Sequence, residues 1–279
     1  MIFDRNHAAS FAANYPDKPS PLRHGLAGCS LLAMDRLLDL TRRLPASSIE
    51  YNAGDLTVGQ DPDKTPMNGL SAEETVRRIS ECRSWIVLKN IEQDAAYERL
   101  LENGLTDVRA MLPGRIGPMF KKEGFVFISS PGAVTPFHMD PEHNILLQVA
   151  GRKTFRIYPQ RETALVSPEQ HEAFHTPGGH RNLAYREEFE RFADVHELGP
   201  GDALYAPVKA PHWVKVGGEV SVSLSITWRS RRSDDEARLH RVNAWLRAHG
   251  RTPSLAGAAP LRDRAKILSH RLAARLALR

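Results

Sequence analysis

The sequence predicts a mainly β fold with helical additions, built around an antiparallel sandwich or small barrel of the jelly-roll kind. Short apolar runs separated by Gly and Pro follow one another between residues 84 and 228. The last run, VSVSLSITW at 220–228, alternates small polar and apolar residues, which is the period of a strand with one buried face. The segments on either side of this region carry apolar residues three and four positions apart, as helices do.

Two helices are predicted before the β region. Residues 28–45, GCSLLAMDRLLDLTRRLP, have helical spacing and stop at a proline. Residues 71–84 begin with Ser71, and Glu74 three positions later completes a capping-box pattern. The segment between them is rich in turn-forming residues and predicts a loop. We therefore expect a helical N-terminal region over 1–83, packed on the core.

Two further helices are predicted after the β region. Residues 234–250 have apolar side chains at helical spacing and end at Gly250, a favourable residue after a helix. Residues 261–279 place one apolar face along the second helix, made by Leu261, Ala265, Leu268, Leu272 and Leu276. The expected organisation is thus a β core over 84–230, followed by a pair of basic amphipathic helices over 231–279.

Composition and charge argue against a disulfide-rich secreted protein and against a membrane-spanning one. The 279 residues are 41% hydrophobic and 25% charged, as in an ordinary globular chain. The net charge of +5 comes from residues 229–279, which hold 13 Lys and Arg against 4 Asp and Glu. This asymmetry leaves an anionic partner open, but the tail lacks a DNA-reading motif, and nucleic acid is not the favoured partner. With two cysteines, no leader pattern and no long apolar stretch, we expect a reducing cytoplasm and no membrane association.

One short motif suggests a zinc protease. Residues 171–175 read HEAFH, which matches HExxH, the pattern in which two histidines one helical turn apart bind zinc. Pro177 and a Gly-Gly pair follow the second histidine almost at once, and the flanking residues are polar. A helix that carries an active-site zinc should instead be buried on one side. We interpret HEAFH as a surface loop or short helix.

A second group of residues indicates a metal site more strongly. In TPFHMD, His138 and Asp140 are two positions apart, so that on a strand they project to the same side. Far downstream, His212 follows a Gly-Asp turn and a Pro-bounded strand. Two histidines and one carboxylate form the facial triad that leaves coordination positions open on iron(II). If 143–149 and 153–158 are neighbouring strands, Lys153 can enter the barrel, where it needs an anion; an outward, solvated lysine is the alternative.

These residues, in this order and spacing, resemble the JmjC/cupin-like family of iron(II)- and 2-oxoglutarate-dependent oxygenases, most closely the branch of the asparaginyl hydroxylase that acts on hypoxia-inducible factor. The resemblance covers roughly residues 80–230 and implies a double-stranded β-helix (cupin) core. It implies that His138, Asp140 and His212 are catalytic iron ligands, that Lys153 and Thr135 bind the distal carboxylate of 2-oxoglutarate, and that Asn144 lies near this cosubstrate. It also places HEAFH inside a variable, substrate-side insertion.

The resemblance implies oxidative decarboxylation of 2-oxoglutarate to succinate and CO₂, coupled to hydroxylation or demethylation of an unidentified protein side chain or small molecule. A metal-binding cupin without oxygenase activity, such as an isomerase or binding module, is the alternative, but it has no need of a dicarboxylate anchor. Relatives use C-terminal helices to dimerise, so we expect a homodimer. One family tyrosine has no counterpart here, with Tyr205 as a candidate substitute, and Ser223 and Ser225 are candidates for the barrel interior. Histidines expected at the surface are His7, His24, His240, His249 and His270.

Overall fold

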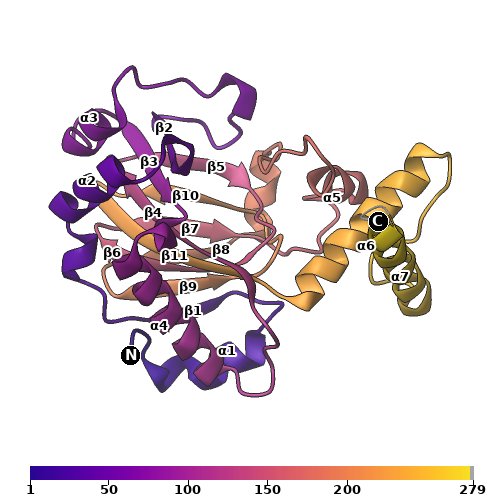
Figure 1. The fold of residues 1–279 in the computed structure, drawn as a ribbon. Coiled ribbons are helices and arrows are strands. Elements are labelled where there is room, and N and C mark those ends of the chain that lie inside the picture. Colours follow the sequence, from indigo (N-terminus) through magenta and orange to yellow (C-terminus); the bar gives the residue numbers. More distant parts are fainter. Residues whose placement is uncertain (277–279) are drawn as a thin grey trace.

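The computed structural model describes residues 1–276, apart from the side chains of Pro62 and residues 273–276. Its core is two antiparallel sheets that face one another (Figure 1), as expected for a mainly β, cupin-type barrel with helical additions. The minor sheet has the order β5-β10-β7-β8. Its strands are β5 (Val134–His138), β7 (Lys153–Ile157), β8 (Asp194–Leu198) and β10 (His212–Val216).

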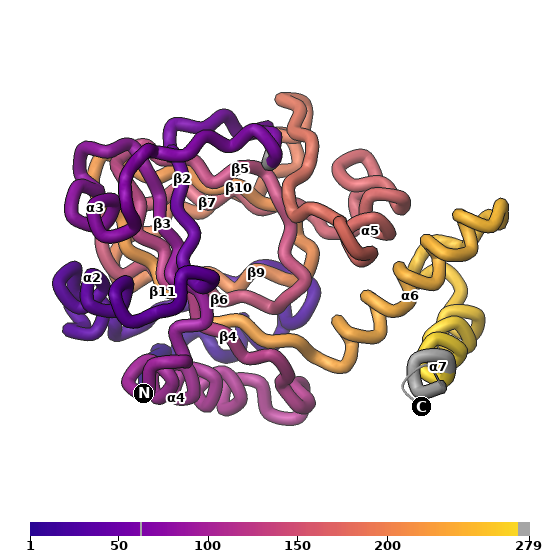
Figure 2. The backbone as a smooth tube through the Cα atoms, turned by 45° about the horizontal axis from the view of Figure 1, so that its top comes forward, coloured from indigo at the N-terminus to yellow at the C-terminus, as the bar shows by residue number. Residues whose placement is uncertain are grey.

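The major sheet has seven strands in the order β1-β9-β6-β11-β4-β3-β2. Its strands are β1 (Ser20–Arg23), β2 (Ile49–Ala53), β3 (Ser84–Lys89), β4 (Phe120–Ser129), β6 (His143–Ala150), β9 (Asp202–Ala206) and β11 (Ser221–Arg229). The N-terminal region thus supplies two strands, β1 and β2, as well as the helices that its sequence predicts. Figure 2 shows the two sheets on opposite sides of the barrel.

The alternation in β11 divides the core into an outer and an inner part. Val222, Leu224 and Ile226 pack in a large apolar cluster with helix α4 (Ala95–Met111). The intervening serines lie on the opposite face of the strand, toward a smaller cluster that joins both sheets. That inner cluster contains Leu146, Phe155, Ile157, Leu198, Leu204, Ala206, Ala210 and Val214. Side chains that share its face therefore point into the barrel.

The N-terminal helices cover the outside of the major sheet. They are α1 (Ala8–Asn14), α2 (Met34–Arg43), α3 (Ala72–Arg77) and α4. The capping box predicted for Ser71 and Glu74 is present at the start of α3. The patterns described above did not predict α4, which begins after Asp94, whose side chain accepts a hydrogen bond from the Ala96 backbone.

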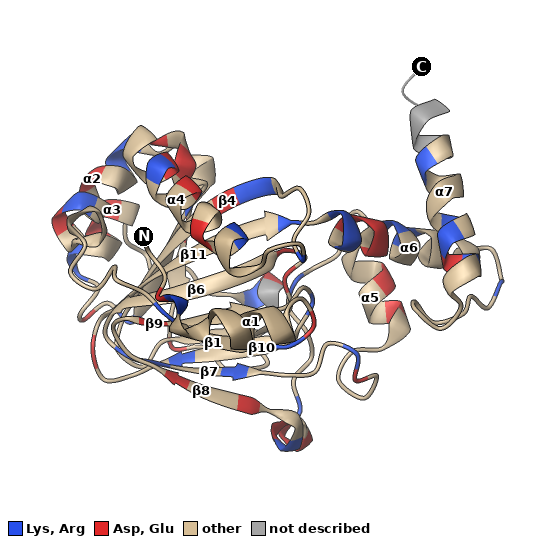
Figure 3. Ribbon diagram, turned by 90° about the horizontal axis from the view of Figure 1, so that it is seen from below, with Lys and Arg blue, Asp and Glu red and all other residues tan. Residues whose placement is uncertain are grey.

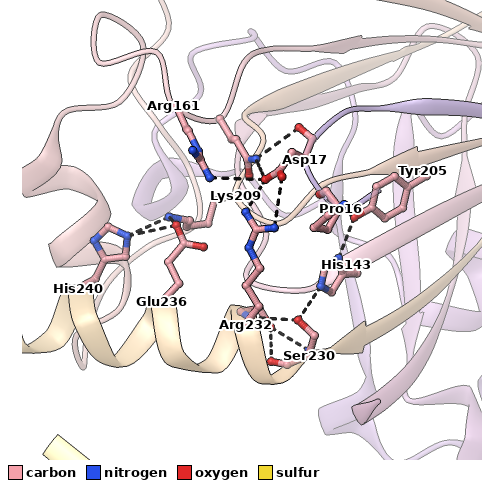
Figure 4. A network of polar contacts seen from close by, with 12 residues as sticks. Pro16, Asp17, His143, Arg161, Tyr205, Lys209, Ser230, Arg232, Glu236 and His240 are labelled. Atoms are coloured by element: carbon pink, nitrogen blue, oxygen red, sulfur yellow. Dashed lines mark hydrogen bonds and ion pairs between the residues drawn. The ribbon is translucent and has the colours of Figure 1, made fainter. Parts of the chain in front are cut away.

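The C-terminal helices α6 (Arg231–Ala248) and α7 (Pro260–Leu276) extend away from the barrel beside α5 (Pro168–Phe174), as Figure 1 shows. Polar contacts hold the start of α6 to the core (Figure 4). Ser230 caps the helix and bonds to the imidazole Nε2 of His143 at 3.0 Å, and Arg232 pairs with Asp17 at 2.7 Å. In α7, Leu261, Leu268 and Leu272 are exposed, and the Leu276 side chain lies outside the described residues. No helix within residues 1–276 is long and apolar enough to cross a membrane.

Candidate metal centre

Two histidines face each other on neighbouring strands of the minor sheet. His138 ends β5, and its antiparallel register partner on β10 is His212. The Nδ1 atoms lie 2.7 Å from the Pro136 carbonyl and 2.9 Å from the Ala210 carbonyl, respectively. A carbonyl can only accept, so each Nδ1 donates and each Nε2 keeps a free lone pair. The two rings are therefore fixed with the nitrogens that can bind a metal on the same side.

Asp140 completes the group from just beyond β5, because the strand ends at His138 rather than continuing to Asp140 as its sequence suggested. Its Oδ2 atom is 3.9 Å from His138 Nε2 and 3.7 Å from His212 Nε2. The three ligand atoms lie within 4.8 Å of one another, and no other such group occurs among the described residues. Two imidazoles and one carboxylate fit iron(II) and would leave positions on it for a chelating cosubstrate and O₂.

Burial and neighbouring charges put Asp140 and His212 in the protonation state that a metal requires. Burial alone would raise the pKa of Asp140, but Arg181, His138 and His212 outweigh it and lower that pKa to about 2. Burial, with His138 as a secondary cause, lowers the pKa of His212 to about 4. At neutral pH the carboxylate is therefore ionised and His212 is neutral, so that no proton has to leave either ligand before a metal binds.

A lysine lies inside the barrel with no counter-ion among the described residues. Lys153 begins β7 opposite Leu198 of the inner cluster, and only 5% of its surface is exposed. Within the described part of the chain its ammonium has no ion-pair partner and lies 5.6 Å from the centre of the Phe127 ring. Burial lowers the pKa of Lys153 to about 7. An isolated buried cation is costly, so the interior is suited to an anionic ligand.

Four other polar side chains share the barrel interior. Thr135 on β5 lies opposite Val214, and Asn144 on β6 lies opposite Ala206, both partners being in the inner cluster. The Asn144 Oδ1 atom and the Ser225 Oγ atom are buried without a hydrogen-bond partner among the described residues. Ser223 faces inward too, but its hydroxyl donates to Gln148 at 2.7 Å. The interior therefore offers unused donors and acceptors beside the buried lysine.

The structure places Tyr205 on the other face of its strand, so it does not substitute for the missing family tyrosine. Its ring packs in the outer cluster, and its hydroxyl donates to the Pro16 carbonyl at 3.0 Å (Figure 4). The same hydroxyl lies 2.8 Å from His143 Nδ1, so His143 also points away from the metal ligands. These two residues join the N-terminal loop to the start of α6.

The HEAFH segment forms the end of helix α5, with His175 just beyond it, and no group of three metal ligands forms there among the described residues. His171 and His175 stack against His240 of α6, with ring centres 5.4 and 5.2 Å apart. His240 is buried rather than at the surface, and its Nε2 atom is 2.9 Å from the Lys209 ammonium. Glu172 makes two hydrogen bonds to Arg247 instead of serving as a base. His24, also expected at the surface, is buried.

A cavity of about 420 Å³ lies between the barrel, α5, α6 and the start of α7. None of the metal-binding group lines it. Several of its charged side chains are already paired with one another, as Lys209 is with Glu236 (Figure 4). These paired walls are suited to packing α6 and α7 against the rest of the protein. They are less suited to the chemistry of a metal site.

The two facing sheets and the His-Asp-His group together define a cupin-type barrel with a candidate metal site. The chain belongs to the cupin-like domain family, which matches residues 43–234. It is 36% identical over 104 residues to lysine-specific demethylase 8 of Danio rerio, a match of 35% of this chain and 25% of that protein. The chain thus spans about a quarter of this curated relative.

Solved structures share the fold over almost the whole chain. Escherichia coli ycfD has a TM-score of 0.56 and 16% identity, with 98% of this chain and 68% of that chain covered. A structure of YcfD, described as a ribosomal oxygenase in complex with cobalt and 2-oxoglutarate, has a TM-score of 0.52 and 15% identity, with 95% and 65% covered. Neither these comparisons nor the demethylase match points to the asparaginyl hydroxylase branch in particular.

Proposed function

We propose that this protein is an iron(II)- and 2-oxoglutarate-dependent dioxygenase that hydroxylates a protein side chain or a small molecule. The observation that carries the proposal is the combination of the triad with Lys153 in one barrel. A facial triad alone would serve many metalloproteins. An unpaired cation buried in the same interior specifically calls for an anionic ligand, and 2-oxoglutarate supplies both a chelating end and a distal carboxylate.

Each residue then has a distinct part. His138, Asp140 and His212 would hold the iron, which supplies the oxidising chemistry once the cosubstrate and O₂ are bound. Lys153 and Thr135 would bind the distal carboxylate, and the amide of Asn144 would lie beside the cosubstrate. The apolar walls formed by the inner cluster exclude water from the ligands.

The names of related proteins favour a protein substrate. One relative is called a lysine-specific demethylase, and the fold also occurs in a protein called a ribosomal oxygenase. Demethylation is hydroxylation of an N-methyl group, so both outcomes need the same site. Hydroxylation is our proposal for this chain, because nothing in its described residues selects a methylated substrate.

The second candidate is a metal-binding cupin without oxygenase activity. The triad is compatible with that function, but the buried lysine would then lower the stability of the fold without serving a ligand. Binding of 2-oxoglutarate to the purified protein distinguishes the two candidates.

The first test is the turnover of 2-oxoglutarate to succinate with iron(II) and ascorbate, without added substrate. We expect slow turnover by the wild type, and its loss in His138→Ala and in Lys153→Ala. Lys215→Ala, which removes an exposed lysine from β10, is the matched control and should keep wild-type turnover. If the wild type shows neither turnover nor calorimetric binding of 2-oxoglutarate, the non-oxygenase cupin replaces this proposal.

We also propose the wider organisation of the protein. Residues 1–83, 84–230 and 231–279 remain our division into an N-terminal layer, a catalytic core and a helical appendage. The exposed leucines of α7 support a homodimer through the C-terminal helices. The two cysteines are free thiols, in keeping with a reducing cytoplasm.

A further inference from the structure

The long connection between β7 and β8 returns to the strand that carries a metal ligand. The Met139 backbone donates to the Arg181 carbonyl at 3.1 Å, and the Leu183 backbone donates to the Phe137 carbonyl at 2.9 Å. Between these bonds, Asn182 forms an antiparallel bridge with His138. Residues 181–183 therefore continue the minor sheet past β5, and their side chains are fixed relative to the metal centre.

This pairing delivers a guanidinium group to the metal ligand Asp140. Arg181 Nη1 donates to Asp140 Oδ1 at 2.6 Å, while Oδ2 is the oxygen that faces the two histidines. Arg181 Nη2 lies 3.8 Å from Glu142 Oε2. Glu142 is itself buried and accepts a 2.8 Å hydrogen bond from Arg229 at the end of β11. Arg181 thus bridges two carboxylates, one of which is anchored to the major sheet.

We propose that Arg181 is a positioning residue that holds the Asp140 carboxylate in the orientation that binds the metal; the inference rests on the metal centre of the proposed function. A carboxylate without this contact can rotate and offer either oxygen or both to the ion. With Oδ1 engaged by Arg181, only Oδ2 faces the two imidazoles. Partners that orient a metal ligand in this way are typically worth 10- to 100-fold in metal affinity.

Repulsion between the guanidinium and the metal ion acts in the opposite direction. Two features reduce it. The Glu142 carboxylate lies beside the guanidinium, and 52% of the Arg181 side chain is exposed to water, which screens its charge. Loss of Arg181 would also leave the buried carboxylates of Asp140 and Glu142 without the cation between them. We therefore expect the gain from orientation to exceed the repulsion.

The test is calorimetric titration of the metal-free, full-length protein with cobalt(II), which replaces iron(II) without being oxidised by air. Arg181→Ala should bind cobalt(II) at least tenfold more weakly than the wild type. Arg181→Lys keeps the charge but loses the planar fork, so its affinity should be intermediate. Arg186→Ala is the matched control, because it removes an exposed arginine of the same connection that does not contact a metal ligand, and it should bind like the wild type.

The visible spectrum of bound cobalt(II) gives a second readout that a general loss of stability would not change. It should differ between Arg181→Ala and the wild type, because a carboxylate that rotates changes the ligand field, and it should be unchanged in Arg186→Ala. Affinity within twofold of the wild type, or tighter, in Arg181→Ala would overturn the inference. If Arg181→Ala does not fold, an Arg181→Lys variant that binds cobalt(II) with wild-type affinity would overturn the inference instead. Absence of binding by the wild type would overturn the metal centre itself, and the inference with it.

Discussion

At the scale of single residues, the proposed role of Lys153 conflicts with the stability of the ligand-free fold. Burial lowers its pKa to about 7, from 10.5 for a solvated lysine. Below pH 7 the lysine is charged in both the folded and the unfolded protein, so its full desolvation penalty opposes folding. Between pH 7 and 10.5 the folded form releases its proton more readily, and the penalty declines to zero as the pH rises. A bound dicarboxylate would remove the same penalty by pairing.

Lys153→Met should therefore stabilise the ligand-free protein while abolishing 2-oxoglutarate binding. We expect a free energy of unfolding higher than that of the wild type by about 1 kcal/mol or more at pH 7, with the difference shrinking as the pH approaches 10. Urea denaturation at several pH values, in a buffer without carboxylates, measures it. Lys215→Met, at an exposed position of β10, should show no such pH-dependent gain. A Lys153→Met variant less stable than the wild type at pH 7 would mean that the lysine has a partner.

Local sequence pointed to the three residues of the candidate metal site but not to the residues that surround them. His138 and Asp140 are two positions apart, and a Gly-Asp turn precedes His212, so local patterns pointed to all three. Arg181 lies 41 positions from Asp140 and belongs to no motif. His240 was expected at the surface, but it is buried because α6 brings it against His171 and His175. Such contacts depend on where distant segments return, which side-chain periodicity does not encode.

At the scale of elements, the turn between β6 and β7 carries the chain from the major sheet to the minor sheet and leads directly into Lys153. Gly151 in this turn has a φ of +67°, and a Cβ atom there would lie 2.3 Å from the Val220 carbonyl oxygen. A left-handed backbone and a backbone contact this close both require glycine. The turn therefore fixes how β7 follows β6, and with it which side of β7 faces the interior.

Gly151→Ala should lower the free energy of unfolding by about 2 kcal/mol or more, since both backbone strain and a clash with main chain oppose it. Gly218→Ala, in the connection between β10 and β11, is the control. A Cβ atom at Gly218 meets nothing within 4 Å, and its φ is not in the left-handed region, so this change should be neutral or slightly stabilising. If urea denaturation gives the two variants the same free energy of unfolding, the prediction is wrong.

The periodicity of elements predicted some of the architecture and missed the rest. The alternating serines of β11 correctly indicated a strand with two different faces. Strands β1 and β2 were missed because they are short and sit in turn-rich segments, and they form only by pairing with β9 and β3. Tertiary pairing here overrides weak local preference.

At the scale of the whole molecule, part of the positive charge of the tail is paired with carboxylates of the same chain. Arg232, Arg238, Arg247 and Arg271 all make ion pairs with carboxylates. Figure 3 shows acidic residues on α5 and both acidic and basic residues on the neighbouring α6. This pairing leaves less unpaired charge for an anionic polymer than the composition suggested, in keeping with our preference against nucleic acid.

The exposed leucines of α7 lead to a prediction about assembly. Leu261, Leu268 and Leu272 are 80%, 62% and 60% exposed, and they recur at helical spacing. We expect the wild type to have twice the chain mass of 31.2 kDa by light scattering. Leu268→Glu combined with Leu272→Glu should give a monomer, because charges would then line the apolar face. Val195→Glu, at an exposed apolar position on β8, is the control and should remain dimeric. A monomeric wild type at micromolar concentration would contradict the homodimer.

The sequence by itself predicted the class of fold and singled out three side chains, His138, Asp140 and His212, that the structure brings together, because strand periodicity and local motifs are properties of the chain alone. Only the tertiary structure decided that Lys153 has no partner among the described residues, that Tyr205 faces away from the barrel, and that Arg181 reaches Asp140. The physical reason is that each of these depends on sheet pairing between distant segments. A register shift of one residue would turn the same side chains to the opposite face.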